Sequence, residues 1–173
     1  MRDVPVLVCK NSPFGSIGVI GWKVIQRVNT AIDFEELQIQ FSSQDNSELH
    51  RKRITDEEKA ECVPFIYLTS MYVIARFGDD LPRAFVFDTG AVASYLHSSN
   101  SNGPEDGQVG SSCSIRIGDL AFDLPQTQFI DFSAIHKTGR YYFPGVIGID
   151  ILRHSVLHIL PRESMLCIEK GES

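Results

Sequence analysis

Short runs of β-branched and aromatic residues, separated by turn residues, dominate the second half of the chain. This pattern is typical of strands, and it predicts them at 65–68, 71–77, 83–87, 114–117, 120–124, 128–130, 156–160 and 165–168. Turn residues at 78–82 and at 118–119 predict two hairpins. The clearest helix signal is a short one over 149–154. The pattern predicts a mainly β protein with one or two short helices.

Two stretches interrupt the apolar pattern. Residues 42–62 contain ten charged residues, with acidic side chains on both sides of the basic cluster 50–53. This composition predicts a solvated linker, with one or two helical turns from Thr55. Residues 98–112 are rich in glycine and serine and have no aromatic residue. Such a composition builds no core and predicts a mobile loop, either an insertion without a role or a functional cover.

Part of the sequence repeats at an offset of 127 residues. Gly18-Val19-Ile20-Gly21 recurs as Gly145-Val146-Ile147-Gly148, and the same offset pairs further apolar positions. These pairs are Val24 with Ile151, Ile25 with Leu152, Ile32 with Ile159, Ile39 with Leu166 and Phe41 with Ile168. The matches favour a duplicated turn–helix–hairpin unit over coincidence.

Composition and charge narrow the class of protein. A chain of 173 residues buries about 70% of the surface that its unfolded form exposes. This burial is enough to form the core of one domain with an appendage. Its 22 acidic and 16 basic side chains give a net charge of −6, which argues against nucleic acid or an anionic membrane as the main partner. The sequence has no apolar run long enough for a transmembrane helix and no secretory signal pattern, so it predicts a cytoplasmic protein, or a fragment whose targeting segment lies elsewhere.

Cysteines and histidines offer no metal site. The four cysteines lie far apart in sequence, which argues against a zinc knuckle, although their even number permits two disulfides. Cys9 and Cys167 stand in apolar stretches and are predicted to be buried free thiols. His154 and His158 have a helical metal-ligand spacing, but the alternation around them predicts a strand with surface histidines. We expect neither a metal nor an organic cofactor.

The strongest candidate for chemistry is Asp88. Asp88 directly follows the apolar strand Phe85-Val86-Phe87, and Thr89 and Gly90 come directly after it. A carboxylate in such a place needs donors, which a threonine hydroxyl and backbone N–H groups around a glycine supply. An isolated Asp-Thr-Gly is also typical of an ordinary strand-end turn; the preceding strand, Ala91 and Ser94 favour a site.

These residues resemble the active-site motif of the retropepsin-like aspartic peptidases. That motif has two apolar residues, Asp-Thr/Ser-Gly-Ala/Ser, and a Thr or Ser three residues later, as in Val86 to Ala91 followed by Ser94. The family's second mark, an apolar-apolar-Gly triplet before a short helix, is similar to Val146-Ile147-Gly148. The resemblance covers about residues 63–168.

The resemblance implies a retropepsin-like acid-protease lobe, a closed or partly open β-barrel with one catalytic aspartate, Asp88. Thr89, Gly90, Ala91 and Ser94 would support the active site, and Gly103, Gly107 and Gly110 would belong to a flap over a peptide or protein substrate. Because such peptidases need two aspartates, the implied enzyme is a homodimeric aspartic endopeptidase.

Three alternatives stay open for the chain as a whole. Residues 1–41 look like the closing half of a second lobe without its own Asp-Thr-Gly, 42–62 form the linker, and 63–168 form the main lobe. Besides a homodimeric peptidase, the chain could be an inactive retropepsin-like module for dimerisation or peptide binding. It could also be one lobe of a two-lobed peptidase whose second aspartate lies elsewhere.

Overall fold

The computed structural model describes residues 20–44, 60–98, 107, 109–110, 112–124, 126–138 and 142–171. They form thirteen strands, two short α-helices and one 3-10 helix, which confirms the prediction of a mainly β protein. In chain order the elements are α1 (Trp22–Ile25), β1 (Asn29–Asp33), β2 (Gln38–Ser42), β3 (Ala60–Tyr67), β4 (Met71–Phe77), β5 (Arg83–Phe87), β6 (Tyr95–His97), β7 (Val109–Gly110), β8 (Cys113–Ile117), β9 (Leu120–Leu124), β10 (Thr127–Ile130), α3 (Ser133–Thr138), β11 (Gly145–Ile147), η3 (Ile149–Leu152), β12 (Ser155–Leu160) and β13 (Met165–Lys170).

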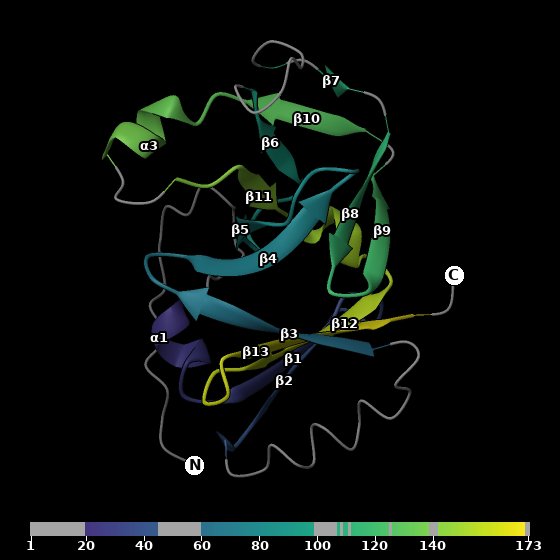
Figure 1. Cartoon of the computed structure of the whole chain (residues 1–173). Helices are drawn as coiled ribbons and strands as arrows, with labels where there is room; N and C mark the ends of the chain where they lie inside the picture. Colours follow the sequence, from purple (N-terminus) through teal and green to yellow (C-terminus); the bar gives the residue numbers. More distant parts are fainter. Residues whose placement is uncertain are drawn as a thin grey trace, which may run out of the picture.

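The strands belong to one mixed sheet whose order is β2-β1-β12-β13-β3-β4-β5-β11-β6-β10-β7, with the β8–β9 hairpin attached to β4. In Figure 1, β2, β1, β12, β13 and β3 lie at the bottom, and the strands from β4 to β10 lie above them. The order runs from β2 to β7 without returning to its start, so the described strands form no closed barrel.

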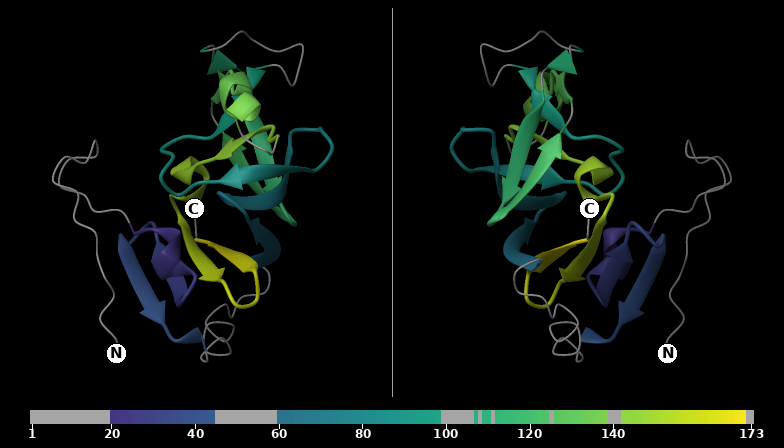
Figure 2. Two further views of the ribbon diagram at one scale, coloured as in Figure 1. Left: turned by 90° about the vertical axis from the view of Figure 1, so that its left-hand side faces the viewer. Right: turned by 90° about the vertical axis from the view of Figure 1, so that its right-hand side faces the viewer.

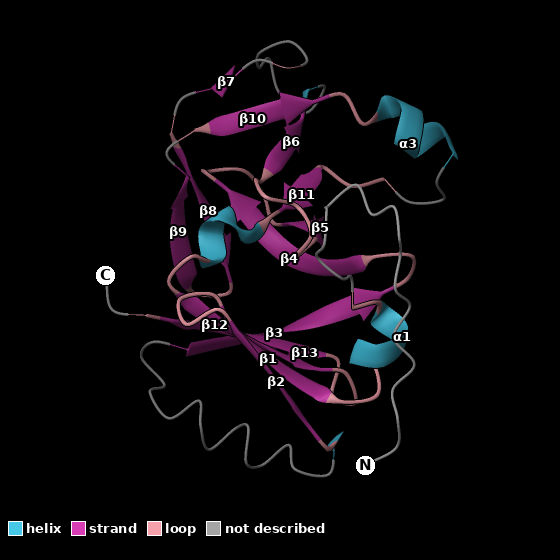
Figure 3. Ribbon diagram, turned by 180° about the vertical axis from the view of Figure 1, so that it is seen from behind, coloured by secondary structure: helices cyan, strands magenta, loops and turns pink. Residues whose placement is uncertain are grey.

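The larger of two hydrophobic clusters among the described residues lies between these two parts of the sheet. Alternation in β4 buries Met71, Val73, Ala75 and Phe77, as expected for a strand with one face toward a core. The side chains of β12 and β13 close this core from below, and α1 packs against it through Trp22 and Ile25. The helix η3 contacts β9 and is the cyan helix beside that strand in Figure 3. The core therefore joins α1 and the β12–β13 hairpin to the strands above them.

The predicted repeat is confirmed as a repeated structure. The helix α1 and the hairpin β1–β2 correspond at the offset of 127 residues to η3 and the hairpin β12–β13. Strands β1 and β12 then pair antiparallel at the centre, with Ala31 opposite His158. Two copies of one unit thus form a continuous four-stranded sheet.

The prediction of a free thiol at Cys167 is wrong, because Cys167 forms a disulfide with Cys62. The two residues lie directly opposite each other in the antiparallel β3–β13 pair, with their Cα atoms 4.0 Å apart. Their separation of 105 residues hid this register from the sequence. Cys113 is a free, half-buried cysteine, and Cys9 lies outside the described residues.

Most predicted strands and both hairpins, β4–β5 and β8–β9, are present. The helix predicted over 149–154 is a 3-10 helix over Ile149–Leu152. Strand β3 begins at Ala60, inside the predicted linker 42–62, while the helical turns predicted from Thr55 lie outside the described residues. Within the described part of the chain, no helix is long and apolar enough to span a membrane.

Candidate functional site

The loop from Asp88 to Ser94 crosses over the end of a neighbouring strand. It joins β5 to β6, and β11 is inserted between these two strands, parallel to β5 and antiparallel to β6. The buried residues Phe85, Val86 and Phe87 fix β5 in the sheet. Since β11 occupies the place between its two neighbours, their connection has to pass over the carboxyl end of β11.

Two backbone hydrogen bonds hold this loop at the end of β11. The Asp88 N–H donates to the carbonyl of Ile147 at 2.9 Å, and the Ile149 N–H donates to the carbonyl of Ala91 at 2.9 Å. Between them, Gly148 lies so close to the loop that an added Cβ would stand 2.4 Å from the carbonyl oxygen of Ala93 and 2.7 Å from that of Ala91. Glycine is required at this position by the approach of the loop.

The Asp88 side chain is exposed at the tip of this arrangement. Its Oδ1 accepts a hydrogen bond from the Gly90 N–H at 2.8 Å, and its carbonyl accepts one from the Ala91 N–H at 3.1 Å. Among the described residues, Oδ2 accepts no hydrogen bond. Thr89 is exposed beside it. The loop thus presents one carboxylate whose first oxygen is held by the backbone.

A buried polar contact behind the loop involves Asp150, which the sequence motif did not identify as a site residue. Ser94 is 2% exposed, and its Oγ donates to Asp150 Oδ1 at 2.6 Å and accepts from the Gly148 N–H at 3.0 Å. Asp150 Oδ2 also accepts from the Ser94 N–H at 2.8 Å. Asp150 is therefore a structural anchor of the loop. The repeat gave no signal for this role, because Lys23 stands at the corresponding position of the first copy.

The glycines of the predicted flap are not brought to Asp88 by the described residues. Gly107 has a φ of +79° and donates its N–H to Phe129, while Gly110 in β7 pairs with Thr127 of β10. A Cβ on Gly110 would stand 2.8 Å from the Phe129 ring. Gly107 is explained by its positive φ and Gly110 by its close approach to β10, and Gly103 lies outside the described residues.

The histidine prediction is wrong for one of the two residues. His154 is exposed, but His158 is 4% exposed in β12, with its Nε2 3.6 Å from Glu169 Oε2. His158 lies on a central strand, opposite Ala31 of β1 on one side and Cys167 of β13 on the other, and is buried rather than on the surface. No group of three metal-ligating side chains is found among the residues that the structure describes.

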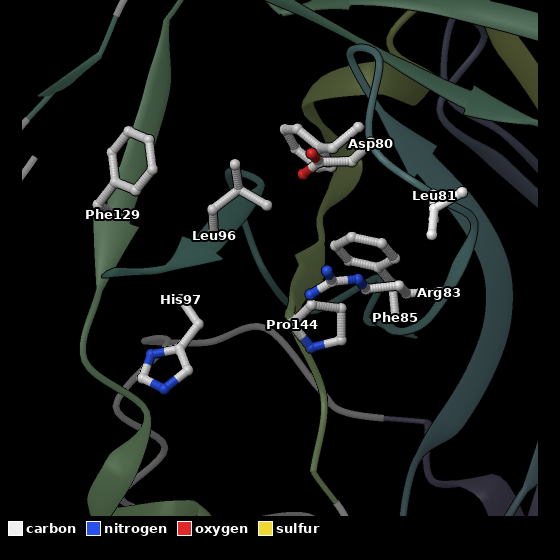
Figure 4. Close-up of a pocket in the computed structure, with 9 residues that line it drawn as sticks. Asp80, Leu81, Arg83, Phe85, Leu96, His97, Phe129 and Pro144 are labelled. Carbon is white, nitrogen blue, oxygen red and sulfur yellow. The ribbon is translucent and has the colours of Figure 1, made fainter. Parts of the chain in front are cut away.

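A small pocket lies at the other end of β5, away from Asp88. Arg83, Phe85, Leu96, His97 and Pro144 line it together with Phe77, Asp80, Leu81 and Phe129 (Figure 4). Its volume of about 30 Å³ has room for one or two water molecules only. It is therefore no substrate site.

Comparison with models of known protein families and with curated proteins found no match to this chain. Its chemistry has to be argued from the site itself. The described residues offer one exposed carboxylate on a braced loop, whereas the other carboxylate near the loop, that of Asp150, is occupied by Ser94.

Proposed function

We propose that the chain is a retropepsin-like lobe of an aspartic endopeptidase, in which Asp88 activates water together with a second aspartate from a partner lobe. The observation that carries the proposal is the braced loop, which fixes one oxygen of Asp88 through the Gly90 N–H and leaves the other accessible. A positioned carboxylate of this kind is what a general base requires. The mainly β fold, with β4, β8 and β9 contributing to its core, supports such a lobe.

The proposed reaction follows from two neighbouring carboxylates that share one proton. The ionised carboxylate takes a proton from a bound water while the water oxygen bonds to the scissile carbonyl carbon. The protonated carboxyl gives its proton to the carbonyl oxygen, so that a neutral tetrahedral diol forms. When the C–N bond breaks, the newly protonated carboxyl gives its proton to the leaving nitrogen, and the ionised carboxylate takes one proton from the diol, whose C–O bond becomes the carbonyl of the product acid. The products are an acid and an amine, and the carboxyl pair again holds one proton. No metal or organic cofactor enters these steps.

Peptide cleavage by wild type and by Asp88→Asn tests the proposal. We expect Asp88→Asn to lower kcat/KM by at least about 100-fold, with Asp119→Asn, a change in the exposed β8–β9 turn, as the matched control. Equal activity of wild type and Asp88→Asn would disprove the catalytic assignment. Wild type that cleaves nothing between acidic and neutral pH, alone or with its partner lobe, would favour the alternative of an inactive dimerisation or peptide-binding module.

Dilution distinguishes two sources of the second aspartate. If a second copy supplies it, as the sequence predicts, the activity falls faster than linearly when the chain is diluted. If a lobe on another polypeptide or elsewhere in a longer chain supplies it, the isolated 173-residue chain is inactive at every concentration.

The cytoplasmic location expected from the sequence stays a prediction, and it does not indicate where the second aspartate comes from. The Cys62–Cys167 disulfide is unusual for that compartment. Mass spectrometry of alkylated protein from its native compartment measures whether these two cysteines are bonded there.

A further inference from the structure

Strand β4 carries apolar side chains on both of its faces. Its odd-numbered residues, from Met71 to Phe77, are buried in the larger hydrophobic cluster. Its even-numbered residues therefore point to the opposite face of the sheet, here called the outer face. At one end of this face, Tyr72 packs against the smaller hydrophobic cluster, whose buried members are Val86, Phe132 and Phe143. The two phenylalanines stand on either side of α3 in the chain, and they cover this end of the outer face.

The apolar surface continues beyond the smaller cluster. Ile74 of β4 is 53% exposed and Ile66 of β3 is 63% exposed. Ile66 is paired with Tyr72, which places it diagonally next to Ile74 on the outer face. Ala84 of β5 lies opposite Ile74 and is exposed as well. These three residues, Ile66, Ile74 and Ala84, form an exposed apolar patch. In Figure 2, α3 lies at the top of the molecule and α1 near the bottom, so the strands of the patch lie between the two helices.

Two arginines border this apolar patch. Arg76 of β4 and Arg116 of β8 lie directly opposite each other, and both are exposed on the outer face. Like charges at directly opposite positions lower the stability of a sheet. Neither arginine forms an ion pair with any of the described residues. Asp123 lies on the same face of β9, opposite Ser114, and makes no ion pair with Arg116. The fold thus holds two positive charges, without a neutralising partner in the described part of the chain, beside an apolar patch.

The patch lies on the face of paired strands rather than at an edge of the sheet. On one side of β4, β5 is bonded to it from Met71 to Ala75, and on the other side β3 and then β8 are bonded to it. A partner therefore cannot add a strand by backbone hydrogen bonds here, and it has to dock through side chains. A helix that lies across the strands docks in this way, with apolar residues on one stripe.

From these observations we infer that the outer face of β3, β4 and β8 docks an amphipathic helix of another protein. Apolar residues of this helix would lie on Ile66 and Ile74, and carboxylates beside them would pair with Arg76 and Arg116. Such a helix supplies both the apolar cover and the negative charge that the described residues leave out. The net charge of −6 disfavours nucleic acid and anionic membranes, because an extended polyanion would also meet the acidic remainder of the surface.

The docking surface is separate from the candidate active site. Ala84 lies near the beginning of β5, whereas Asp88 follows the end of that strand. The inference therefore goes beyond the proposed function and does not rest on it.

Two synthetic amphipathic peptides test the inference on the full chain by fluorescence anisotropy. Each is about 15 residues long, or about four helical turns, with leucine along one stripe and either glutamate (the acidic peptide) or lysine (the basic peptide) beside it. We expect the acidic peptide to bind wild type. Arg76→Glu with Arg116→Glu should weaken this binding at least about tenfold and strengthen binding of the basic peptide by a similar factor. The gain for the basic peptide shows that the variant is folded.

The matched control is Arg83→Glu with Arg27→Glu, which changes the net charge equally. Arg83 is exposed on the other face of β5, in line with Phe85, and Arg27 is exposed after α1. This control should bind the acidic peptide within about twofold of wild type. Ile74→Ser should weaken the binding of both peptides to their preferred variants, because it removes apolar contact rather than charge.

Four outcomes overturn the inference. The first is no binding of the acidic peptide to wild type at about 1 mM, and the second is equal binding to wild type and to the variant with both arginines reversed. The third is binding of wild type to phosphatidylcholine–phosphatidylserine vesicles that this variant loses, since a membrane would then occupy the surface. The fourth is a dimer in sedimentation that Ile66→Lys with Ile74→Lys converts to a monomer, since a second copy would then cover the patch.

These readouts do not depend on catalysis. Asp88→Asn should bind the acidic peptide as wild type does. If the peptide binds as expected but no variant cleaves a substrate, the proposed function fails and the docking surface stands. If Asp88→Asn abolishes cleavage while the acidic peptide does not bind, the docking surface alone fails.

Discussion

The replacement Gly148→Ala tests whether the Asp88 loop is held by its approach to the end of β11. The new Cβ would stand 2.4 Å and 2.6 Å from the carbonyl oxygen and carbon of Ala93, and 2.7 Å from the carbonyl oxygen of Ala91. All three are backbone atoms, so no side chain can turn aside to make room. The loop has to shift by several tenths of an ångström or more, which strains the hydrogen bond from Ile149 to Ala91 and that from Gly148 to Ser94.

The expected cost combines overpacking, about 1–3 kcal/mol, with the weakening of one or two hydrogen bonds, each about 1 kcal/mol. We therefore expect Gly148→Ala to lower the free energy of unfolding by about 2–4 kcal/mol, measured by urea denaturation followed by circular dichroism. For a chain of this length, the corresponding fall in Tm is about 5–14 °C.

Gly21→Ala is the matched control, because Gly21 is the repeat equivalent of Gly148. Both glycines precede a short helix with an extended backbone and no side-chain cap. Their intrinsic effects on helix capping and chain entropy are therefore similar. With no atom within 4 Å of its Cβ, Gly21→Ala should change the free energy of unfolding by less than about 0.5 kcal/mol. Equal effects of the two replacements would refute the steric argument.

Three further predictions concern the scaffold. Ser94→Ala should destabilise the fold by about 1–3 kcal/mol in urea denaturation, because it leaves the buried Gly148 N–H without its acceptor and removes a donor to Asp150; a change below about 0.5 kcal/mol would contradict the anchor role. Reduction of Cys62–Cys167, or its replacement by two serines, should cost about 2–5 kcal/mol, since the bond closes a loop of 105 residues; equal urea midpoints with and without reductant would count against it. Burial, and next the nearby His97, lower the pKa of His136 from 6.5, so its contribution to stability is complete above that pH and is lost as the pH falls below it. The Tm of wild type should therefore fall more between pH 7 and pH 5 than that of His136→Phe, and parallel curves would disprove the assignment.

The sequence predicted those parts of the fold that depend on local pattern. The β4–β5 and β8–β9 hairpins were predicted because alternating apolar residues and a turn lie next to each other in the chain. Strands β6 and β11 have only three residues each, and their pairing partners are distant in sequence, so no local pattern could reveal them. The same holds for the Cys62–Cys167 disulfide and for the burial of His158, which both follow from the register of β13 with its two neighbours.

The candidate site shows the same division. Asp88, Gly90 and Ser94 were identified from a contiguous motif, but their support comes from Gly148 and Asp150, more than fifty residues away. The sequence could indicate that a carboxylate follows a buried strand. Only the insertion of β11 between β5 and β6 explains why the loop is rigid there.

The contacts that hold the Asp88 loop allow it to fold without a second lobe, whereas the proposed catalysis requires one. Among the described residues, the contacts that hold Asp88 in place all come from the same lobe: Ile147 and Ile149 on the backbone, Gly90 on the carboxylate, and Ser94 with Asp150 behind it. A second lobe is not needed to form this half-site, so the chain can fold with its aspartate already positioned. One carboxylate cannot be both the base and the acid of the proposed reaction at the same moment. Assembly with the proposed partner lobe would then supply chemistry rather than structure, and mixing the two lobes should restore cleavage without a slow phase from refolding of the Asp88 loop.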